Sequence, residues 1–411
     1  MKKYVILFIL SFTAMGLSAQ SLEDYWQLAA ENNPALKAKF TQYLAALERV
    51  DQQGALPDPT VSFGVFVSPV ETRVGAQRLR ISLNQMFPWM GTNSAREDLA
   101  VKMAEARFAE FEEARNSLFL KVSETWLMLS ELKQEIELKR ENLRLLKTYE
   151  PIAKTKYESN LTSLADLIRI QIKIEDAATN LELLELKRKP LVSDFNTYLN
   201  RSVDSEVDIS NPLPEHAITS SLDSALANNP KIKANQKEIA GADTQLKLAE
   251  LKRRPNIGVG LDYVMISERK DMTMADNGKD ALMPMVSLSL PIFGKKNRSL
   301  IKETELFKES LSLQNEGIQN DIKNQWVKAE YLESTSSREL ELYEREIRNT
   351  RSLLNVLTSE YSNNSSNFEE LLMTQQQLLQ LQIAQVKAMT KQHQAWLQKR
   401  YLTGNFLTIK P

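Results

Sequence analysis

Hydrophobic residues alternate with small or polar ones over two short stretches in the first half of the chain. Residues 60–68 and 78–86 place apolar side chains at every second position, and residues 69–77 between them are expected to form a loop. The same alternation returns in residues 257–263 and 285–290. A period of two with one apolar face is typical of a β-strand. We therefore expect two β-hairpins, over approximately 60–87 and 256–291.

Outside these stretches the pattern is helical. Residues 92–150 contain neither glycine nor proline, and as one α-helix they would extend over roughly 90 Å, more than a compact globule of this size requires. A polar break at Ser159–Asn160 precedes a second helix, which runs to Tyr198 with an apolar seam close to coiled-coil spacing. A helix is also expected over residues 21–53, with a kink or break at Pro34.

The chain repeats this order of elements once. Asn32–Asn33–Pro34 returns as Asn228–Asn229–Pro230, and the Pro-x-x-Gly sequence that begins at Pro88 returns at Pro291. Self-similarity in a fixed order indicates a duplicated architecture. We expect a first repeat over 21–200 with a helical hairpin at 92–198, a linker over 201–220, a second repeat over 221–405 with a helical hairpin at 295–403, and a tail over 406–411.

Four amphipathic strands are too few to close a barrel, and an open sheet would leave two edges exposed. The simplest solution is a barrel that several copies of the chain share. The alternation alone does not separate a membrane barrel from a soluble two-layer sheet. Together with very long helices, however, shared strands suggest a tube that spans a cell envelope.

Composition narrows the possible functions. The 411 residues include 52 Lys and Arg against 53 Asp and Glu, so the net charge of −1 offers no field for nucleic acid. Cysteine is absent, which excludes disulfides and thiolate metal sites, and His216 and His393 are interpreted as surface residues. Because the chain has no phosphate-binding loop, nucleophile elbow or cluster of histidine and carboxylate, we predict neither an enzyme nor a cofactor.

The N-terminal segment has the features of a secretory signal peptide over residues 1–20. Lys2 and Lys3 precede an apolar stretch that begins at Val5, and small residues around Ala19 would form the cleavage zone. No later segment has the roughly 20 consecutive apolar residues of a transmembrane helix. We therefore expect an exported protein whose mature chain contains no such helix.

With these features in place, the mature chain resembles the TolC family of outer-membrane efflux channels over residues 21–405. The resemblance is carried by the duplicated order, the two Asn-Asn-Pro helices, the strand end at Ser287–Gly294 and the helical turn at Tyr157–Leu167. It implies a fold that is mainly α with a small β part. Three protomers with four strands each would form a trimeric 12-stranded β-barrel in the cell outer membrane, continued by an α-helical tunnel in the periplasm.

The function that this resemblance implies is a passive duct in a tripartite efflux system, exporting small molecules or metal ions. Its partners would be two further copies of the chain, outer-membrane lipid, a periplasmic adaptor (membrane fusion) protein and an inner-membrane pump of the RND type. Residues 56–59 and 68–73 resemble the heavy-metal-efflux branch more than the drug branch.

The resemblance also assigns site residues. The hairpin tips would dock the adaptor, and the family usually has glycine where this chain has asparagine at both tips; asparagine also tolerates the left-handed backbone. The family narrows its tunnel with acidic residues past the second tip, where Glu370 occupies the first such position and Met373 the second. A solvated glutamate on a helix is the other interpretation of Glu370. The tip residues are Asn160, Leu161 and Ser163 in the first hairpin and Asn364, Ser365 and Asn367 in the second.

Methionines are concentrated in the second β-hairpin. Thioether sulfurs suit Cu(I) or Ag(I), and Met86 and Met90 lie at the end of the first hairpin. Methionine also fills lipid-facing or loop positions without binding anything, so both interpretations stay open. The five candidate ligands are Met265, Met272, Met274, Met283 and Met285.

Two alternative classes of protein remain. A periplasmic adaptor would have one helical hairpin flanked by β-rich domains, whereas this chain predicts two hairpins and no such domains. An exported coiled-coil scaffold would account for the helices but not for four alternating strands. Membrane fractionation with heat-modifiable gel mobility separates these classes from a trimeric channel.

Overall fold

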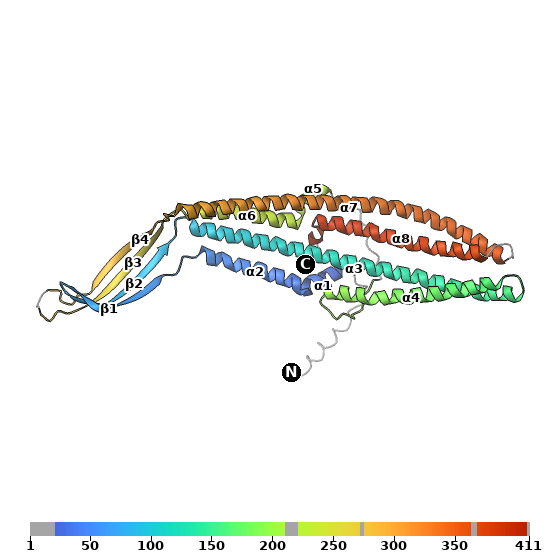
Figure 1. Ribbon diagram of the computed structural model, residues 1–411, viewed down its shortest axis with the longest axis horizontal. Helices are drawn as coiled ribbons and strands as arrows, with labels where there is room; N and C mark the ends of the chain where they lie inside the picture. The colour runs from blue at the N-terminus through green and yellow to red at the C-terminus, as the bar shows by residue number, and fades with distance from the viewer. Residues whose placement is uncertain (1–20, 210–220, 272–274, 363–367, 409–411) are drawn as a thin grey trace, which may run out of the picture. The chain divides into compact units, whose positions relative to one another are not determined.

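The computed structural model describes residues 21–209, 221–271, 275–362 and 368–408. Within them the chain forms eight α-helices and four β-strands, which Figure 1 labels in chain order. The predicted fold class, mainly helical with a small antiparallel sheet, is confirmed. Two compact units divide the chain: one comprises residues 1–37, 112–229 and 320–411, and the other comprises residues 38–111 and 230–319. Each unit draws on both sequence repeats.

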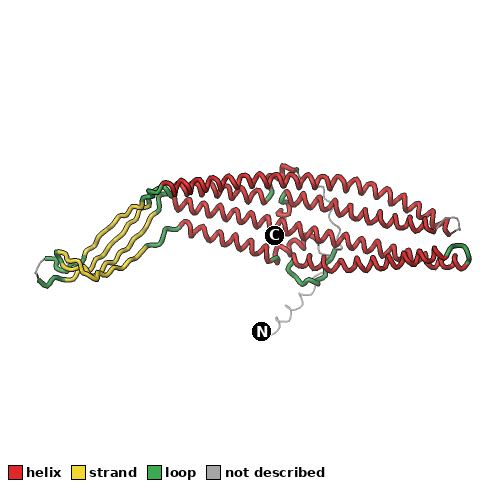
Figure 2. The backbone as a smooth tube through the Cα atoms, viewed as in Figure 1, coloured by secondary structure: helices red, strands yellow, loops and turns green. Residues whose placement is uncertain are grey.

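The second of these units, the sheet unit, contains all four strands. They are β1 (Thr60–Thr72), β2 (Gly75–Phe87), β3 (Asn256–Ser267) and β4 (Ala281–Ser289), and they lie side by side in that order (Figure 2). All neighbouring pairs are antiparallel. The helical part of this unit comprises most of α2 (Pro34–Gly54), α6 (Pro230–Leu251) and the first turns of α3 (Thr92–Glu158) and α7 (Gly294–Ser362).

The loop expected over residues 69–77 is wrong, because β1 continues to Thr72 and β2 already begins at Gly75. Thr72 pairs with Gly75, and its hydroxyl donates a hydrogen bond to the Gly75 carbonyl oxygen at 2.6 Å. Gly75 has φ 133°, and a Cβ atom there would lie 1.8 Å from the carbonyl oxygen of Ser267. Only glycine fits this turn. Pro69 is tolerated in β1 because β1 is an edge strand whose register with β2 is interrupted between Val65 and Val70.

The first unit, the helical unit, contains a group of packed aromatic side chains at α1. Besides the longer parts of α3 and α7, it contains α1 (Leu22–Asn32), α4 (Leu164–Tyr198), α5 (Leu222–Asn228), α8 (Phe368–Leu402) and a 3₁₀ turn at Asn405–Thr408. Trp26 of α1 is fully buried between the rings of Phe119 and Phe406, and its indole N–H donates to the Ser123 hydroxyl at 2.8 Å. This bond satisfies the polar end of a side chain that otherwise packs as an apolar group.

The break expected at Pro34 is confirmed, because α1 ends at Asn32 and α2 begins at Pro34. Asn33 caps the start of α2 through its side-chain oxygen, which accepts the Leu36 N–H at 3.0 Å, while its amide donates to the Tyr198 carbonyl at the end of α4 at 3.0 Å. The second repeat has the same device. Asn229 donates to the Leu402 carbonyl at the end of α8 at 2.9 Å. Each Asn-Asn-Pro sequence therefore joins a short helix to the returning helix of its own repeat.

Candidate functional site

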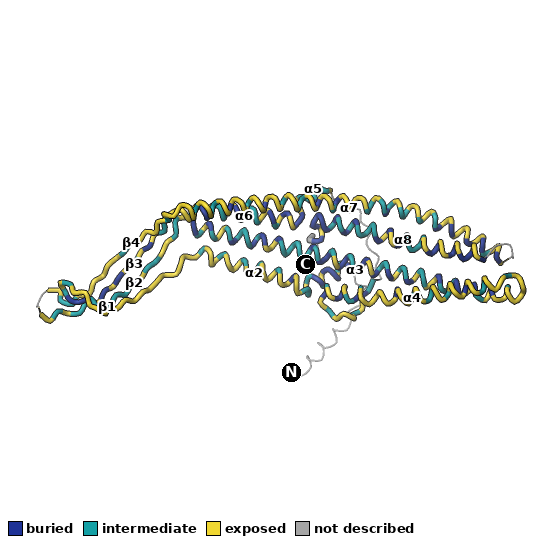
Figure 3. The backbone as a smooth tube through the Cα atoms, viewed as in Figure 1, coloured by how far each residue is buried: buried dark blue, intermediate teal, exposed yellow. Residues whose placement is uncertain are grey.

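One face of the sheet is apolar over most of its paired residues, with Gln85, opposite Val259, as a polar exception. The strand register places Phe63, Ile81 and Tyr263 side by side across three strands, and Leu282 continues this row on β4. Most of these side chains are exposed in the single chain, and Figure 3 shows β1 and β4 as largely exposed. Phe63 is 73% exposed and Val286 79% exposed. A contiguous exposed apolar face of this kind requires a cover of lipid or protein. The other exposed members are Val61, Val65, Leu83, Phe87, Ile257, Val259, Leu261 and Leu288.

The opposite face of the sheet carries the small and polar side chains. Ser62, Ser82 and Asp262 form one row across three strands, and Ser287 lies opposite Gly258. The predicted alternation is therefore confirmed, with Val61, Phe63, Ile81, Val259 and Leu288 on the apolar face and Ser62, Arg80, Asp262 and Ser287 on the polar face.

Glycines let the neighbouring strands approach each other on the polar face. A Cβ atom on Gly260 would lie 2.2 Å from the Asn84 side-chain oxygen, and one on Gly258 would lie 2.2 Å from the Ser287 hydroxyl. Side chains from β2 and β4 thus occupy the space over β3. A residue larger than glycine at either position would have to displace these side chains.

The methionine candidates are divided between the two faces. Met283 lies opposite Asp262 and Met285 opposite Gly260 on the polar face, whereas Met265 pairs with Leu79 on the apolar face. The Met285 sulfur lies 3.9 Å from an Arg80 guanidinium nitrogen, and a fixed positive charge disfavours a metal cation there. Met272 and Met274 lie outside the described residues. The structure therefore does not bring the five methionines together as one ligand set.

The first hairpin tip, between α3 and α4, is defined by Asn160. Its φ of 55° is left-handed, as expected for asparagine at a position where the family usually has glycine. The Asn160 N–H donates to the Tyr157 carbonyl at 2.9 Å, and the Leu161 N–H donates to the Lys156 carbonyl at 2.8 Å. These two bonds form a Schellman motif that ends α3. Leu161 follows directly and is 58% exposed, so the turn presents an apolar side chain to solvent.

Ser163 begins the returning helix of the same tip with a capping box. Its hydroxyl accepts the Asp166 N–H, and the Asp166 carboxylate accepts the Ser163 N–H in return. Burial raises the pKa of Asp166, but hydrogen bonds from Thr162 and Ser163 outweigh this effect and hold the pKa below its ordinary value. The carboxylate is therefore ionised at neutral pH and stabilises the N-terminus of α4.

In the second tip, Asn364, Ser365 and Asn367 lie outside the described residues. The rings of Tyr361 and Phe368, which flank this segment, stack at 4.9 Å between centroids with an interplanar angle of 29°. Lys156 of the first hairpin lies over the Tyr361 ring at 3.9 Å from its centroid, and it donates to the Tyr361 carbonyl. The ends of the two helical hairpins are therefore in direct contact within one chain.

A buried apolar cluster extends this contact along all four helices. Leu146 and Ala153 on α3 and Ile170 on α4 pack with Leu354 on α7 and Leu371 on α8. On the surface beside it, Arg169 of α4 pairs with Glu369 of α8 at 3.2 Å. The sequence pattern did not reveal these cross-hairpin contacts, because no local signal states which hairpins are neighbours. The described ends of the two helical hairpins therefore lie side by side in the helical unit.

Glu370 lies in the first turn of α8, exposed to solvent, and no ion pair to it is found among the described residues. Its neighbour Glu369 instead forms an ion pair with Arg169. Met373, one turn further along α8, is 67% exposed. The structure of a single chain is thus compatible with a free carboxylate at this position, both as a solvated residue and as part of a ring formed with other copies.

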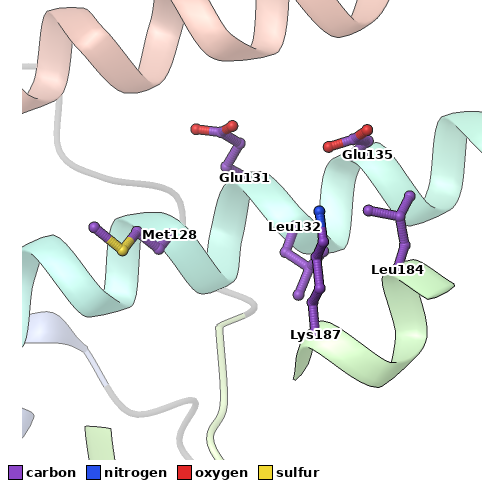
Figure 4. A pocket seen from close by; sticks show the side chains of 6 residues that line it. All are labelled: Met128, Glu131, Leu132, Glu135, Leu184 and Lys187. Carbon is purple, nitrogen blue, oxygen red and sulfur yellow. The ribbon is translucent and has the colours of Figure 1, made fainter. Parts of the chain in front are cut away.

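A cavity of about 160 Å³ lies between α3 and α4 (Figure 4). Met128, Leu132 and Leu184 form its apolar wall, and its charged lining residues are Glu131, Glu135 and Lys187. Glu135 pairs with Lys139 at 3.5 Å. Because this cavity is smaller than the roughly 300–1,000 Å³ of typical ligand pockets, it is not a candidate ligand site.

None of the helices in the described residues is both long enough and apolar enough to cross a membrane. In the same residues, no three histidine or acidic side chains are grouped in a way that could hold a metal ion.

Comparison with known proteins identifies the class to which this chain belongs. The family described as outer membrane efflux protein matches residues 26–192 and again residues 221–405, one match in each repeat. The chain therefore belongs to the outer membrane efflux protein family. Its function is that of an outer-membrane channel in efflux. No curated protein matches the sequence.

Solved structures share the fold at low sequence identity. A membrane protein from Pseudomonas aeruginosa is 16% identical with a TM-score of 0.79, over 93% of this chain and 90% of that one. The outer membrane protein VceC from Vibrio cholerae is 16% identical with a TM-score of 0.76, over 93% and 96%. CusC, described in terms of transmembrane channel formation, is 13% identical with a TM-score of 0.76, over 93% and 91%.

Proposed function

We propose that three copies of this chain form a transmembrane channel whose wall is one continuous sheet. The two-faced sheet is the observation that carries this proposal. Its apolar face would meet outer-membrane lipid, and its polar face would line the aqueous lumen. The edge strands β1 and β4 both need partners. Because each chain contributes an even number of alternating strands, β4 of one copy meets β1 of the next in the antiparallel direction.

The assembly is tested by native mass spectrometry of the detergent-purified protein, together with gel mobility before and after boiling. A trimer that resists dodecyl sulfate until it is boiled, and that conducts ions in planar bilayers, is the expected result. A monomer that keeps its β-structure in detergent and shows no conductance would refute the proposal.

We propose further that the tips of the two helical hairpins, around Asn160 and Asn364, dock a periplasmic adaptor. This adaptor would couple the channel to an inner-membrane pump of the RND type. The exposed Leu161 and the cross-hairpin contact of Lys156 with Tyr361 support this proposal, because they place an accessible apolar side chain beside hairpin ends that hold each other in place. A photo-crosslinker placed at Leu161 should capture an adaptor in cells. The same crosslinker at Arg144, an exposed α3 residue paired with Glu141, is the control and should capture none.

We also propose that Glu370 from three copies narrows the periplasmic entrance as a ring of like charges. Such a ring attracts cations. Glu370→Ala should raise single-channel conductance or weaken cation selectivity in planar bilayers, whereas Glu369→Ala removes a carboxylate that already has a partner, Arg169. Equal conductance and selectivity in the wild type and Glu370→Ala would mean that Glu370 is an ordinary solvated residue.

A soft metal ion is a candidate cargo of this channel. The sequence resemblance of residues 56–59 and 68–73 to the heavy-metal-efflux branch supports this candidate, as do Met283 and Met285 on the polar face. The nearby guanidinium of Arg80 opposes a resident metal site but not passage of an ion. Deletion of the gene should sensitise cells to copper or silver salts, and unchanged sensitivity to both would remove metal ions as cargo.

A further inference from the structure

One ion pair lies on the polar face of the sheet. Arg80 on β2 and Asp262 on β3 are diagonal neighbours, because Ser82, two residues from Arg80, pairs directly with Asp262. A guanidinium nitrogen of Arg80 donates to a carboxylate oxygen of Asp262. Across the paired residues of the four strands on this face, these two side chains are the charged ones; the rest are small, polar, apolar or methionine.

The two partners differ sharply in exposure. The Asp262 side chain is 0% exposed, whereas the Arg80 side chain is 41% exposed. The carboxylate is therefore buried under its partner, and the guanidinium forms the accessible surface beside Met285. If either partner were removed, the charge of the other would remain at this level of the sheet without compensation.

The geometry of the pair does not maximise stability. Arginine and carboxylate often pair through two parallel hydrogen bonds. Here the second carboxylate oxygen of Asp262 and the Nε of Arg80 are buried without a hydrogen-bond partner in the described part of the chain. A buried pair that is only partly satisfied gains little stability over apolar residues of similar size. A role beyond stability is thus the better explanation.

We propose that the Arg80–Asp262 pair sets the charge selectivity of the channel within its β-sheet wall. This inference rests on the proposed function, in which the polar face lines the lumen. Three pairs, one from each copy, would lie at one level of the aqueous passage. Walls of low dielectric constant focus the field of any uncompensated charge into such a passage. By neutralising each other, Arg80 and Asp262 keep this level permeable to ions of either sign.

The test is the reversal potential of purified channels in planar bilayers under a potassium chloride gradient at constant pH. Asp262→Asn leaves Arg80 uncompensated and should shift the reversal potential towards that of chloride. Arg80→Gln leaves Asp262 uncompensated and should shift it towards that of potassium. The double variant Arg80→Gln/Asp262→Asn should return to the wild-type value.

Opposite shifts and their cancellation distinguish selectivity from a merely structural role, which would lower the yield of channels without this sign pattern. Arg78→Gln is the matched control, because Arg78 is an exposed arginine of the same strand nearer the turn, where it donates to the Ser267 hydroxyl at 3.2 Å. It should change the reversal potential less than Arg80→Gln. Conducting channels whose reversal potential is the same in both single variants would overturn the inference.

If a single variant fails to assemble, two substitutions that leave the ion pair intact test the same inference. Met285 lies beside Arg80 on the same face. Met285→Glu should shift the reversal potential towards potassium and Met285→Lys towards chloride, and equal values in these two would also refute the inference. A wild-type protein that forms no channel at all would instead refute the proposed function.

Discussion

At the scale of single residues, the backbone of Asn160 shows how closely the first tip is specified. Its left-handed φ of 55° is costly for most side chains, by about 1–2 kcal/mol, and asparagine is among the few that adopt it readily. The two hydrogen bonds that end α3 depend on this one conformation. A turn that is fixed in this way can present Leu161 in a defined position to a partner.

The first prediction concerns this position. Asn160→Val should destabilise the turn by roughly 1–2 kcal/mol, because a β-branched side chain is strained at positive φ. Limited trypsin digestion of the purified protein should then cut faster after Lys154 or Lys156. Asn160→Gly, which adopts the same φ without strain, is the control and should be cut no faster than the wild type. Equal rates in both variants would mean that the turn does not depend on this residue.

The second prediction is a pH dependence at the same tip. Because the folded-state pKa of Asp166 lies below its ordinary value, the carboxylate contributes stability above that ordinary value, and this contribution is lost as pH falls through the folded-state pKa. Hydrogen exchange of the first turn of α4 should therefore speed up below pH 4, relative to the rest of α4. In Asp166→Asn this acid-dependent increase should be absent, and an increase of the same size in both proteins would contradict the assignment.

At the scale of elements, the two Asn-Asn-Pro sequences perform the same structural task in both repeats. In each, the second asparagine donates to a carbonyl at the end of the returning helix, Tyr198 or Leu402. The helix ends themselves also match, because left-handed residues follow both, Asn200 with φ 52° and Gly404 with φ 68°. The sequence repeat that signals the family is therefore a repeated helix-capping device.

The third prediction separates the two asparagines of this sequence. Asn229 is 1% exposed, so Asn229→Ala leaves the Leu402 carbonyl buried without its donor, at a cost of about 1–3 kcal/mol. Asn228→Ala is the matched control, because exposed Asn228 makes a long side-chain hydrogen bond, to Ser224 at 3.4 Å, and no other from its side chain within the described part of the chain. Thermal unfolding should show a lower midpoint for Asn229→Ala alone. A similar loss in both variants would show that the cap contributes nothing specific.

The elements also show where sequence analysis succeeds and where it ends. Local periodicity was sufficient for the strands, for the face on which Val61 or Ser62 lies and for the break at Pro34, because these depend on neighbouring residues only. The loop expected over residues 69–77 is wrong, and the strand that replaces it holds Pro69 only because β1 is an edge strand. The Arg80–Asp262 pair was out of reach, because β2 and β3 belong to different repeats and no local pattern states that they pair.

The fourth prediction tests the two faces with adjacent residues of one strand. Val286 is 79% exposed on the apolar face, and Ser287 follows it on the polar face. Arginine at a lipid-facing position near the bilayer midplane costs about 2–4 kcal/mol. Val286→Arg should therefore reduce the heat-modifiable trimer in outer-membrane fractions, whereas Ser287→Arg should not. A loss of similar size in both would mean that the apolar face does not meet lipid.

At the scale of the whole molecule, the sheet is the part that a single chain leaves incomplete. β1 and β4 lie at opposite edges of one open four-stranded sheet, in the order β1-β2-β3-β4. Two strands separate them, so β1 and β4 of the same chain do not pair with each other. Identical copies joined head to tail either close into a ring or grow without limit. The family to which the chain belongs is one of discrete channels, which favours the ring.

The fifth prediction uses the absence of cysteine from the chain, which makes any engineered pair the only source of disulfides. Ser62→Cys on β1 combined with Ser287→Cys or Ser289→Cys on β4 places both thiols on the polar face but at opposite edges of the sheet. A disulfide can then form only between copies. Oxidised membranes analysed on non-reducing gels should show linked dimers and trimers and no larger species.

Ser82→Cys with Ser287→Cys is the control, because β2 is an interior strand and should not reach the β4 edge of a neighbour. A ladder that continues beyond three chains would indicate an open assembly, and the absence of any link in both β1–β4 pairs would contradict the shared sheet itself.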